Sequence, residues 1–348
     1  MDKKIAILAT GAIGSSIGAD FTQAGYDVLL IDQWPAHVEA MKTRGLRVTK
    51  AYQVLIPVTA CHLCELASLK PQFDMVFLTS KSIDTSWLVE FIKPYLKPDG
   101  LLLSIQNSLN DEWISPIIGA ERDIGCALEL SAEVFEPGTV QRDTDRNASR
   151  FVIGELDGKI TPRIQEVAQI LSLTGRTEVT ANIWGAKWTK LVYNTMNSAL
   201  GPIGGKKSRD MLKTPKYLAF AIKMGKEAVE VGKALGYILE PVFGMTAEEF
   251  AGSSDEDLKR LLLKINTDVD SSGLDHHTAV EQDFIKGRRS EAGEYLNGLV
   301  AAKGRQVGVP TPYNDALVLV VRQVEQGKLE RNRSTLEMLT SQPPGQIT

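Results

Sequence analysis

The sequence has few cysteines, no long hydrophobic run and no excess of basic residues, and each of these absences disfavours a class of protein. Only three of the 348 residues are cysteine. Three are too few for a secreted disulfide framework, and an odd number leaves at least one free thiol, which favours the reducing cytoplasm. No apolar run approaches the ~18 residues that a membrane-spanning helix needs. Lysine and arginine total 39 against 43 acidic residues, a net charge of −4, so neither a membrane nor a nucleic-acid partner is indicated.

The composition that remains is that of a globular protein, with 43% hydrophobic and 24% charged residues. At ~100–200 residues per domain, the length predicts two domains. The first half alternates short apolar runs with longer segments of helical spacing, the pattern of an α/β fold in which helices cover both faces of a doubly wound parallel sheet. The predicted strands are Lys4–Leu8, Asp27–Ile31, Asp74–Thr79, Leu101–Ser104, Ile124–Ala127 and Phe151–Gly154, with a turn at Glu136-Pro137-Gly138-Thr139-Val140.

Strand patterns fade beyond residue 181, and long stretches rich in Ala, Leu, Glu and Lys follow. This change predicts a sheet-containing domain over residues 1–181, a mostly α-helical substrate or catalytic domain over 182–340, and a flexible tail over 341–348. The longest predicted helices of the second domain are Tyr217–Leu235, Asp255–Ile265, Glu291–Arg305 and Asn314–Gln326.

A glycine-containing turn joins the first predicted strand to the helix-like segment Ser15–Gln23. The turn reads Ala9-Thr10-Gly11-Ala12-Ile13-Gly14, which matches the dinucleotide-binding pattern GxGxxG except that Ala9 replaces the first glycine. We interpret the replacement as a first turn that needs no positive φ angle, or one that differs slightly in shape. Amide groups at such a helix start can face a pyrophosphate. The pattern predicts a Rossmann-type domain, in which Gly18 lets the helix approach the sheet.

Asp32 ends the second predicted strand, ~20 residues after the glycines, where a carboxylate can accept hydrogen bonds from both ribose hydroxyls of NAD. A carboxylate there would repel the 2′-phosphate of NADP, and the following Gln33-Trp34-Pro35 supplies no cation. The sequence therefore favours NAD over NADP. The alternative is that Asp32 only caps a helix predicted over Ala36–Thr43.

A polar stripe follows one side of a helix predicted over Trp184–Leu200 and ended by Gly201-Pro202. Its members are Lys190, Asn194 and Asn197, at positions i, i+4 and i+7, with Ser198 beside them. The stripe is either a solvated face or a ligand-binding face. Asparagine is a poor helix former that occurs where its amide has a fixed partner, which favours ligand binding.

Together these features resemble the ketopantoate reductase family, the 2-dehydropantoate 2-reductases and their relatives, over roughly residues 4–324. Several short motifs beyond the glycine turn occur in the family's order. They are Thr79-Ser80-Lys81, Ile105-Gln106-Asn107-Ser108, Glu136-Pro137-Gly138, Trp188-Thr189-Lys190-Leu191 with Asn194, Gly287-Arg288-Arg289-Ser290-Glu291, Tyr295-Leu296-Asn297-Gly298 and Gly308-Val309-Pro310-Thr311-Pro312-Tyr313-Asn314.

The resemblance implies an NAD(P)-dependent oxidoreductase that transfers a hydride between nicotinamide and C2 of a small 2-oxo or 2-hydroxy acid. Lys190 would be the catalytic lysine that gives a proton to the carbonyl oxygen, and Glu291 would hold the substrate or Lys190. The substrate would contact Asn194, Asn197 and Ser198. Lys81 and Asn107 would lie near the nicotinamide end of the cofactor, and Ser131 would line the same cleft between the domains.

Some positions depart from the family pattern, mostly in the implied substrate pocket. Ser198 stands where the family has a second asparagine, and Asn197 stands one residue earlier. The family's serine before its Gln-Asp pair falls on Ala279. One extra residue before Asn297 leaves Glu291 and Glu294 as alternatives for the pocket carboxylate.

These departures lead us to expect a relative of ketopantoate as substrate. Another hydroxy acid or opine-like NAD dehydrogenase, and an NAD-binding regulator without turnover, stay as alternatives. The sequence leaves open whether the chain forms a homodimer.

Other patterns are interpreted as structural. Cys61-His62-Leu63-Cys64 has CxxC spacing but lacks a second cysteine pair, so we expect it to begin a helix after Val54–Val58 and to bind no metal. Asp275-His276-His277 is expected at a loop or helix start. The basic runs Gly205-Lys206-Lys207 and Lys286-Gly287-Arg288-Arg289 are expected on solvated surface.

Overall fold

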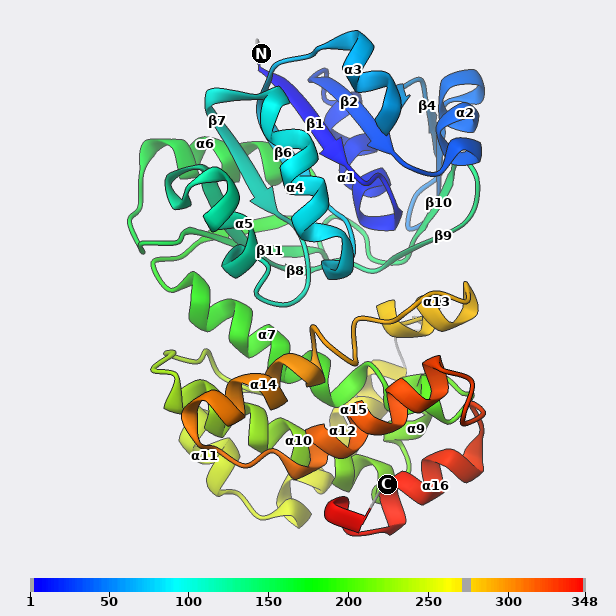
Figure 1. Cartoon of the computed structure of the whole chain (residues 1–348), viewed down its shortest axis with the longest axis vertical. Coiled ribbons are helices and arrows are strands. Elements are labelled where there is room, and N and C mark those ends of the chain that lie inside the picture. The colour runs from blue at the N-terminus through cyan, green and yellow to red at the C-terminus, as the bar shows by residue number, and fades with distance from the viewer. Residues whose placement is uncertain (1–2, 271–276, 347–348) are drawn as a thin grey trace. The chain divides into compact units, whose positions relative to one another are not determined.

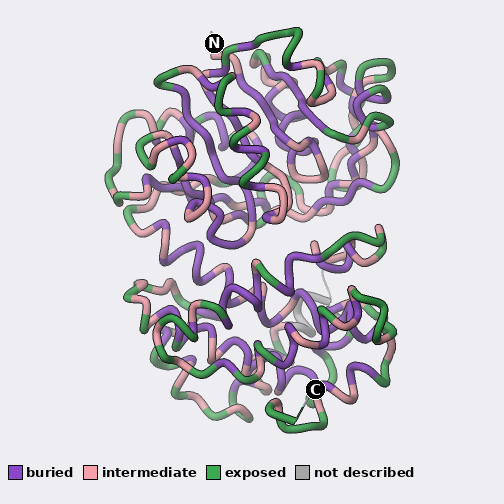
Figure 2. Tube along the Cα trace, in the orientation of Figure 1, coloured by how far each residue is buried: buried purple, intermediate pink, exposed green. Residues whose placement is uncertain are grey.

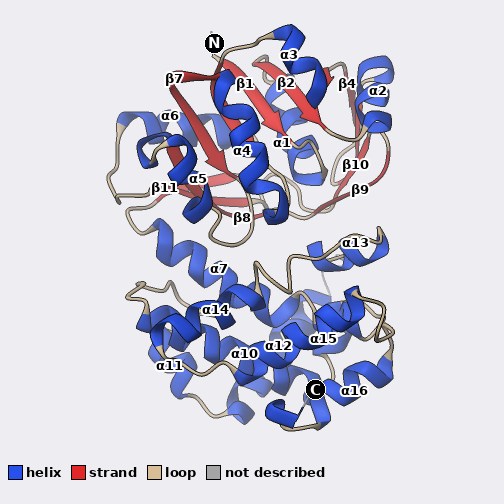
Figure 3. Ribbon diagram, in the orientation of Figure 1, coloured by secondary structure: helices blue, strands red, loops and turns tan. Residues whose placement is uncertain are grey.

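A computed structural model describes residues 3–270 and 277–346 of the chain. The chain divides into two compact units, Met1–Trp184 and Gly185–Thr348. Strands belong to the first unit, and the described residues of the second form helices joined by loops (Figure 3).

A sheet forms the centre of the first unit (Figure 1). It has eight strands, in the order β12-β11-β8-β7-β6-β1-β2-β5. Neighbouring strands are parallel except β8 and β11, which are antiparallel. This confirms the doubly wound sheet and each of the strands predicted for it. The strands are β1 (Lys4–Leu8), β2 (Asp27–Asp32), β5 (Thr59–His62), β6 (Phe73–Leu78), β7 (Leu96–Ser104), β8 (Asp123–Glu129), β11 (Arg150–Glu155) and β12 (Arg176–Val179).

Successive side chains of the central strands enter two different hydrophobic clusters, one on each face of the sheet. Ile5 and Ile7 of β1 belong to the cluster that contains Phe21, whereas Ala6 and Leu8 belong to the other. A parallel sheet covered on both faces therefore needs uninterrupted apolar strands, and these strands are drawn as buried in Figure 2. Helices α1 (Ala12–Gln23) and α6 (Pro162–Leu171) contribute to the first cluster, and α4 (Thr85–Ile92) and α5 (Asp111–Ile118) contribute to the second.

A second sheet of four short strands, absent from our prediction, packs in the same cluster as α1. Its order is β4-β3-β10-β9, and Val48 and Val140 join the cluster of Phe21. The predicted turn at Gly138, with φ at 76°, connects two of these strands. The bounds are β3 (Leu46–Lys50), β4 (Val54–Ile56), β9 (Ala132–Glu136) and β10 (Thr139–Arg142).

The CxxC segment does not begin a helix as expected. Cys61 lies in β5, because its backbone pairs with Ile31 of β2, and a 3-10 turn, η1 (Leu63–Glu65), and then a short helix, α3 (Leu66–Leu69), follow. Helix α2 (Pro35–Arg44) matches the prediction made for that segment.

The second unit is built from helices joined by loops, which confirms a mostly helical second half. Tyr217–Leu235, Asp255–Ile265 and Asn314–Gln326 were each predicted close to an observed helix. The helices are α7 (Ile183–Asn197), α8 (Leu200–Ile203), α9 (Ser208–Leu212), α10 (Pro215–Ala234), α11 (Ala247–Gly252), α12 (Asp255–Asp270), α13 (Ala279–Ile285), α14 (Asn297–Val307), α15 (Pro312–Glu325) and α16 (Arg333–Ser341).

Two predicted helix boundaries in this unit were wrong. Helix α7 ends at Asn197, because the poor helix formers Asn197 and Ser198 interrupt the helix before Gly201. Gly201-Pro202 lies inside the short helix α8. The predicted helix Glu291–Arg305 begins only at Asn297. A Cβ on Gly298 would lie 2.4 Å from the carbonyl oxygen of Gly293, so a turn folds back tightly before α14.

The expected tail, 341–348, begins at the last residue of α16 and includes a 3-10 turn, η5 (Pro344–Gln346). Residues 347 and 348 lie outside the described residues, and the tail's flexibility stays a prediction.

Candidate functional site

The glycine turn lies at the point where the main sheet changes winding direction. Strand β1 is flanked by β2 on one side and by β6 on the other, and ligands of such sheets bind beyond the carboxyl ends of the strands at this point. The segment after β6 meets the turn directly. The backbone N–H of Thr79 donates to the carbonyl of Leu8 at 3.0 Å, and its hydroxyl donates to the carbonyl of Ala9 at 2.8 Å.

Ala9 adopts a left-handed backbone conformation, with φ at 63°. Our interpretation that the first turn needs no positive φ angle was therefore wrong. The turn keeps the shape for which glycine is favoured, and the N–H of Thr10 closes it by donating to the carbonyl of Ile31 at 3.1 Å.

Helix α1 presents an uncapped N-terminus next to this turn. Its N-cap is Gly11, no side chain caps the first turn, and the first turn contains no acidic residue. The first N–H groups of a helix have no partner within the helix, and together with the helix dipole they attract an anion. A Cβ built on Gly11 would meet only the carbonyl oxygen of Ala9, at 4.0 Å, so a pyrophosphate has room to approach.

Two further glycines bring α1 close to the sheet, as we expected for Gly18. A Cβ on Gly18 would lie 2.4 Å from Cδ2 of Leu30, and one on Gly14 would lie 2.4 Å from Oγ1 of Thr79. The residues of the glycine turn therefore fit the pyrophosphate of a dinucleotide.

Asp32 is the last residue of β2 and is 8% exposed. Its Oδ1 accepts the backbone N–H of Trp34 at 2.7 Å, which shapes the turn that leads into α2. The N-cap of α2 is Trp34, so Asp32 lies two residues before the N-cap position, and the role of Asp32 toward the ribose stays a prediction.

An amide network fixes the segments that carry Lys81 and Asn107. Nε2 of Gln106 donates to the carbonyl of Ser80 at 3.1 Å and to the hydroxyl of Thr85 at 2.8 Å. Asn110 accepts from that hydroxyl at 2.9 Å and donates to the carbonyl of Asn107 at 2.5 Å. The segments that follow β6 and β7 are thus held together. Sequence reasoning missed Thr85 and Asn110, since neither belongs to a recognised motif.

Ser131 is held by the loop after β10. Its hydroxyl donates to Asp143 Oδ2 at 3.1 Å, and its N–H donates to Oγ1 of Thr144 at 3.1 Å. Asp143 also forms an ion pair with Lys50 at 2.6 Å. A role for Ser131 toward the cofactor remains a prediction.

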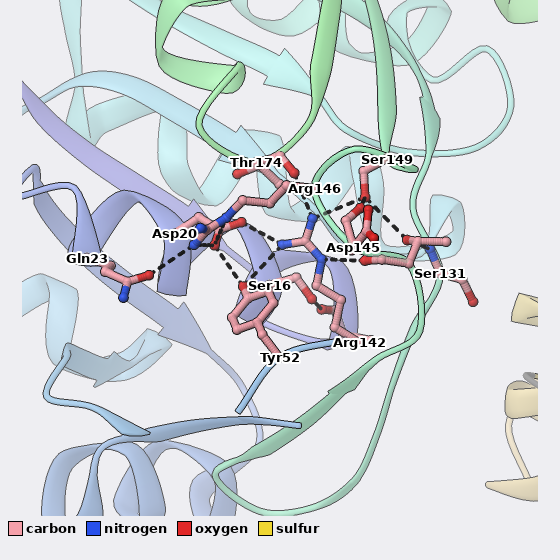
Figure 4. Close-up of polar contacts among 12 residues, drawn as sticks. Ser16, Asp20, Gln23, Tyr52, Ser131, Arg142, Asp145, Arg146, Ser149 and Thr174 are labelled. Atoms are coloured by element: carbon pink, nitrogen blue, oxygen red, sulfur yellow. Dashed lines mark hydrogen bonds and ion pairs between the residues drawn. The ribbon is translucent and has the colours of Figure 1, made fainter. Parts of the chain in front are cut away.

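A buried ion pair that sequence reasoning missed holds the other end of α1 (Figure 4). Arg142 of β10 and Asp20 of α1 have 0% and 1% exposed side chains and lie 2.6 Å apart. Arg146 also donates to Asp20, and so does the hydroxyl of Tyr52, at 2.7 Å. All five N–H donors of Arg142 have acceptors, namely Asp20, Tyr52, Ser149 and the carbonyls of Thr144 and Thr174.

The predicted polar stripe lies on α7 except for Ser198, which follows its last residue. The three members on the helix, Lys190, Asn194 and Asn197, are half-buried, and Ser198 is buried. The other side of α7 is fixed in the unit's core by Trp188, which is fully buried and donates its indole N–H to the carbonyl of Ala228 at 2.8 Å. A solvated face would be fully exposed, so the half-burial of these three side chains argues against that alternative.

The two candidate carboxylates have different surroundings. Glu291 is 2% exposed, whereas Glu294 has a 47% exposed side chain that pairs with Arg289. The neighbouring Ser290 is also fixed, because its N–H and its hydroxyl both donate to Oε1 of Glu325 at 2.8 Å. Burial thus distinguishes Glu291 as the carboxylate of the interior.

Other patterns named in the sequence have the following places. Cys61 and Cys126 are buried and Cys64 is exposed. Within the described residues, no group of three or more His, Cys, Asp or Glu side chains is arranged to hold a metal, and Asp275 and His276 lie outside those residues.

The exposed Arg288 and Arg289 line a cavity of about 660 Å³, together with Arg322 and Arg331. Over the part of the chain that is described, no helix combines the length and the apolarity needed to cross a membrane.

The first unit has a mostly parallel sheet with a glycine turn at its switch point. The second unit is helical and carries a lysine and asparagines on one helix. Together these features define a two-domain dinucleotide-dependent oxidoreductase. The family model described as ketopantoate reductase PanE/ApbA matches residues 5–158, and its C-terminal counterpart matches residues 182–325. The chain belongs to the ketopantoate reductase family, and it is an NAD(P)-dependent oxidoreductase of that type.

Similar proteins extend over nearly the whole chain. The 2-dehydropantoate 2-reductase of Archaeoglobus fulgidus is 27% identical, over 93% of this chain and 99% of its own. That of Pyrococcus horikoshii is 29% identical, over 92% and 97%. Among solved structures, a PanE/ApbA family ketopantoate reductase from Ralstonia eutropha JMP134 is 26% identical, with a TM-score of 0.76 over 93% of this chain and 99% of its own. A D-mandelate dehydrogenase with NADH and anilino(oxo)acetate has the same fold, at 24% identity and a TM-score of 0.80 over 93% and 99%.

Proposed function

We propose that the protein uses NADH to reduce a small 2-oxo acid related to ketopantoate to the 2-hydroxy acid, and catalyses the reverse oxidation with NAD. The observation that carries the proposal is the combination, within one unit, of a half-buried lysine and asparagine one turn apart on α7 and a buried carboxylate. Lys190 and Asn194 supply the first two groups, and Glu291 supplies the third.

The dinucleotide, when bound, supplies or accepts the hydride. The glycine turn and the uncapped start of α1 would hold its pyrophosphate. Asp32 would accept hydrogen bonds from the ribose hydroxyls and disfavour a 2′-phosphate through charge repulsion, which supports NAD over NADP. Lys81 and Asn107 would lie toward the nicotinamide.

The lysine and its neighbours would perform the proton transfer. The ammonium of Lys190 would hydrogen-bond the C2 carbonyl oxygen and stabilise the charge that develops there, then give it a proton as the hydride reaches C2. Asn194 would orient the substrate with its amide, and Asn197 and Ser198 would contact the rest of the substrate. Glu291 would hold the substrate or the ammonium through its carboxylate.

The test is to follow the absorbance of NADH and of NADPH separately against a panel of 2-oxo acids that includes ketopantoate. The reverse reaction is followed with NAD and the 2-hydroxy acids, and Lys190→Ala is the comparison variant. We expect turnover with NADH and its loss in Lys190→Ala. Full activity of that variant would contradict the role of Lys190, and a preference for NADPH would contradict the role of Asp32. Saturable NADH binding without turnover on any substrate would instead indicate the NAD-binding regulator. Sedimentation of the same preparation decides between a monomer and a homodimer.

A further inference from the structure

Two buried asparagines and a half-buried glutamate form a continuous hydrogen-bonded chain across four helices of the second unit. Nδ2 of Asn297, on α14, donates to the carbonyl oxygen of Thr195 on α7 at 3.1 Å and to Oδ1 of Asn314 on α15 at 2.9 Å. Nδ2 of Asn314 in turn donates to Oε2 of Glu227 on α10 at 2.7 Å and to the carbonyl of Met224 at 3.1 Å. We refer to Asn297, Asn314 and Glu227 as the interhelical hydrogen-bonded chain.

The chain ends on the last turn of α7. Because α7 ends at Asn197, the carbonyl of Thr195 belongs to the last four, which lack an N–H partner within the helix. Asn297 supplies that missing donor from another helix. Thr195 directly follows Asn194, so the hydrogen bond fixes the turn of α7 that carries Asn194 and Asn197.

The far end of the chain is equally fixed. Glu227 accepts the backbone N–H groups of Tyr313 and Asn314 at 2.8 and 3.0 Å, so its carboxylate caps the N-terminus of α15 from a neighbouring helix. The side chain of Asn314 therefore has little freedom, and it transmits this restraint to Asn297.

Buried amides make this core less stable than apolar side chains would. Asn297 and Asn314 are both 0% exposed, and Oδ1 of Asn297 has no hydrogen-bond partner among the described residues. A buried polar atom without a partner destabilises the folded state, and an apolar side chain of similar size would avoid that loss. Stability alone does not account for an amide at this place, whereas a directional bond to α7 does.

We infer that Asn297 is a positioning residue, which sets the placement of the last turn of α7, and with it Asn194, for binding of the 2-oxo acid. Asn314 and Glu227 keep Asn297 in the orientation that reaches Thr195. This inference rests on the proposed function, because it gives Asn194 its role toward the substrate.

The experiment compares the full-length protein with Asn297→Leu, which removes the bond to Thr195 but keeps the branched shape, and with Asn297→Asp, which replaces the donor by an oxygen. Asn332→Ala is the matched control, since Asn332 caps α16 through the N–H of Thr335 at 3.0 Å, and its loss lowers stability without touching α7. Each protein is measured for kcat and KM with the 2-oxo acid, for the Kd of NADH, for Tm, and for hydrogen exchange of the segment 195–203.

We expect both Asn297 variants to lower kcat/KM for the 2-oxo acid by about tenfold or more, the scale of a misplaced binding group. Exchange of the segment 195–203 should rise, and the Kd of NADH should stay unchanged. The inference is overturned if exchange rises while kcat/KM does not change, or if Asn332→Ala lowers kcat/KM as much at equal Tm. Should one Asn297 variant not fold, the other decides. Undiminished activity of Lys190→Ala would overturn the proposed function instead, so the two failures are distinguishable.

Discussion

The hydroxyl of Thr79 and the position where Gly14 would carry a Cβ are 2.4 Å apart, and the same hydroxyl donates to the carbonyl of Ala9. Thr79 thus binds the glycine turn and also limits the size of the residue at position 14 of α1. Replacement Gly14→Ala should therefore separate α1 from the sheet.

We expect Gly14→Ala to lower the free energy of unfolding by about 1–3 kcal/mol, as overpacking does, and to weaken NADH binding. Urea denaturation and fluorescence titration with NADH measure the two effects. Gly252→Ala is the control, because a Cβ on Gly252 meets nothing within 4 Å. Equal stability of the two variants would contradict the close approach at Gly14.

Ala9→Gly should increase the free energy of unfolding by about 0.5–1 kcal/mol. At φ of 63° alanine carries a steric penalty that glycine lacks, and this relief exceeds the extra entropy that glycine gives the unfolded chain. The comparison is Ala12→Gly, at the first position of α1, where the helical conformation gives glycine no such advantage and stability should fall. Urea denaturation of both variants checks the difference in sign, and a loss in both would argue against the left-handed turn.

Asp20→Asn should destabilise the first unit by about 3–5 kcal/mol, because it leaves the guanidinium of Arg142 buried without a countercharge. The exposed pair Arg305 and Asp315, whose side chains are 66% and 47% exposed, provides the control. Arg305→Gln should change stability by only about 0.5 kcal/mol or less. Thermal unfolding of both variants measures the contrast, which would vanish if Arg142 were accessible to water.

The stability of the second unit should fall as the pH rises from about 4.5 to about 7. Burial raises the pKa of Glu227 from 4.5 to about 7, although the N–H groups of Tyr313 and Asn314 act in the opposite direction. Between these values the folded protein holds a proton that the unfolded chain has lost. Glu227 therefore contributes stability that is fully present below pH 4.5 and lost as the pH passes about 7, with a slope of at most about 1.4 kcal/mol per pH unit.

Glu227→Gln tests this dependence, because glutamine does not titrate. Urea denaturation at several pH values should show a shallower slope for the variant between pH 4.5 and 7. The variant should also be less stable at every pH, since its amide opposes one of the N–H groups that Glu227 accepts. An unchanged slope would mean that another group titrates in this range.

Much of the first unit follows from its sequence, because a parallel sheet buried on both faces needs apolar strands that stand out as runs such as Ile5–Leu8. The second sheet did not follow from the sequence, because β3 alternates buried and exposed residues over only five positions. Its stabilising partner is also distant, since Arg47 pairs with Thr139. Pairing between such short segments is decided by tertiary packing on α1, which no local pattern reveals.

The site shows the same division. The glycine turn and the α7 stripe are local patterns and were found, whereas the positive φ of Ala9 was not, because alanine gives no signal for it. In the sequence, Asn297 fell inside the predicted helix Glu291–Arg305 and Asn314 began the next predicted helix, and both were noted only as members of family motifs. Their role depends on an encounter between α7, α10, α14 and α15 that only the folded chain creates.

Helix α1 is immobilised along its whole length, by the Thr79 contact at its start, by Gly18 against Leu30 in its middle and by Asp20 near its end. A helix held in this way has little conformational entropy left to lose when a dinucleotide docks on its N-terminus. The binding surface that we propose for the pyrophosphate would thus be assembled during folding, and cofactor binding there would need no rearrangement of this helix.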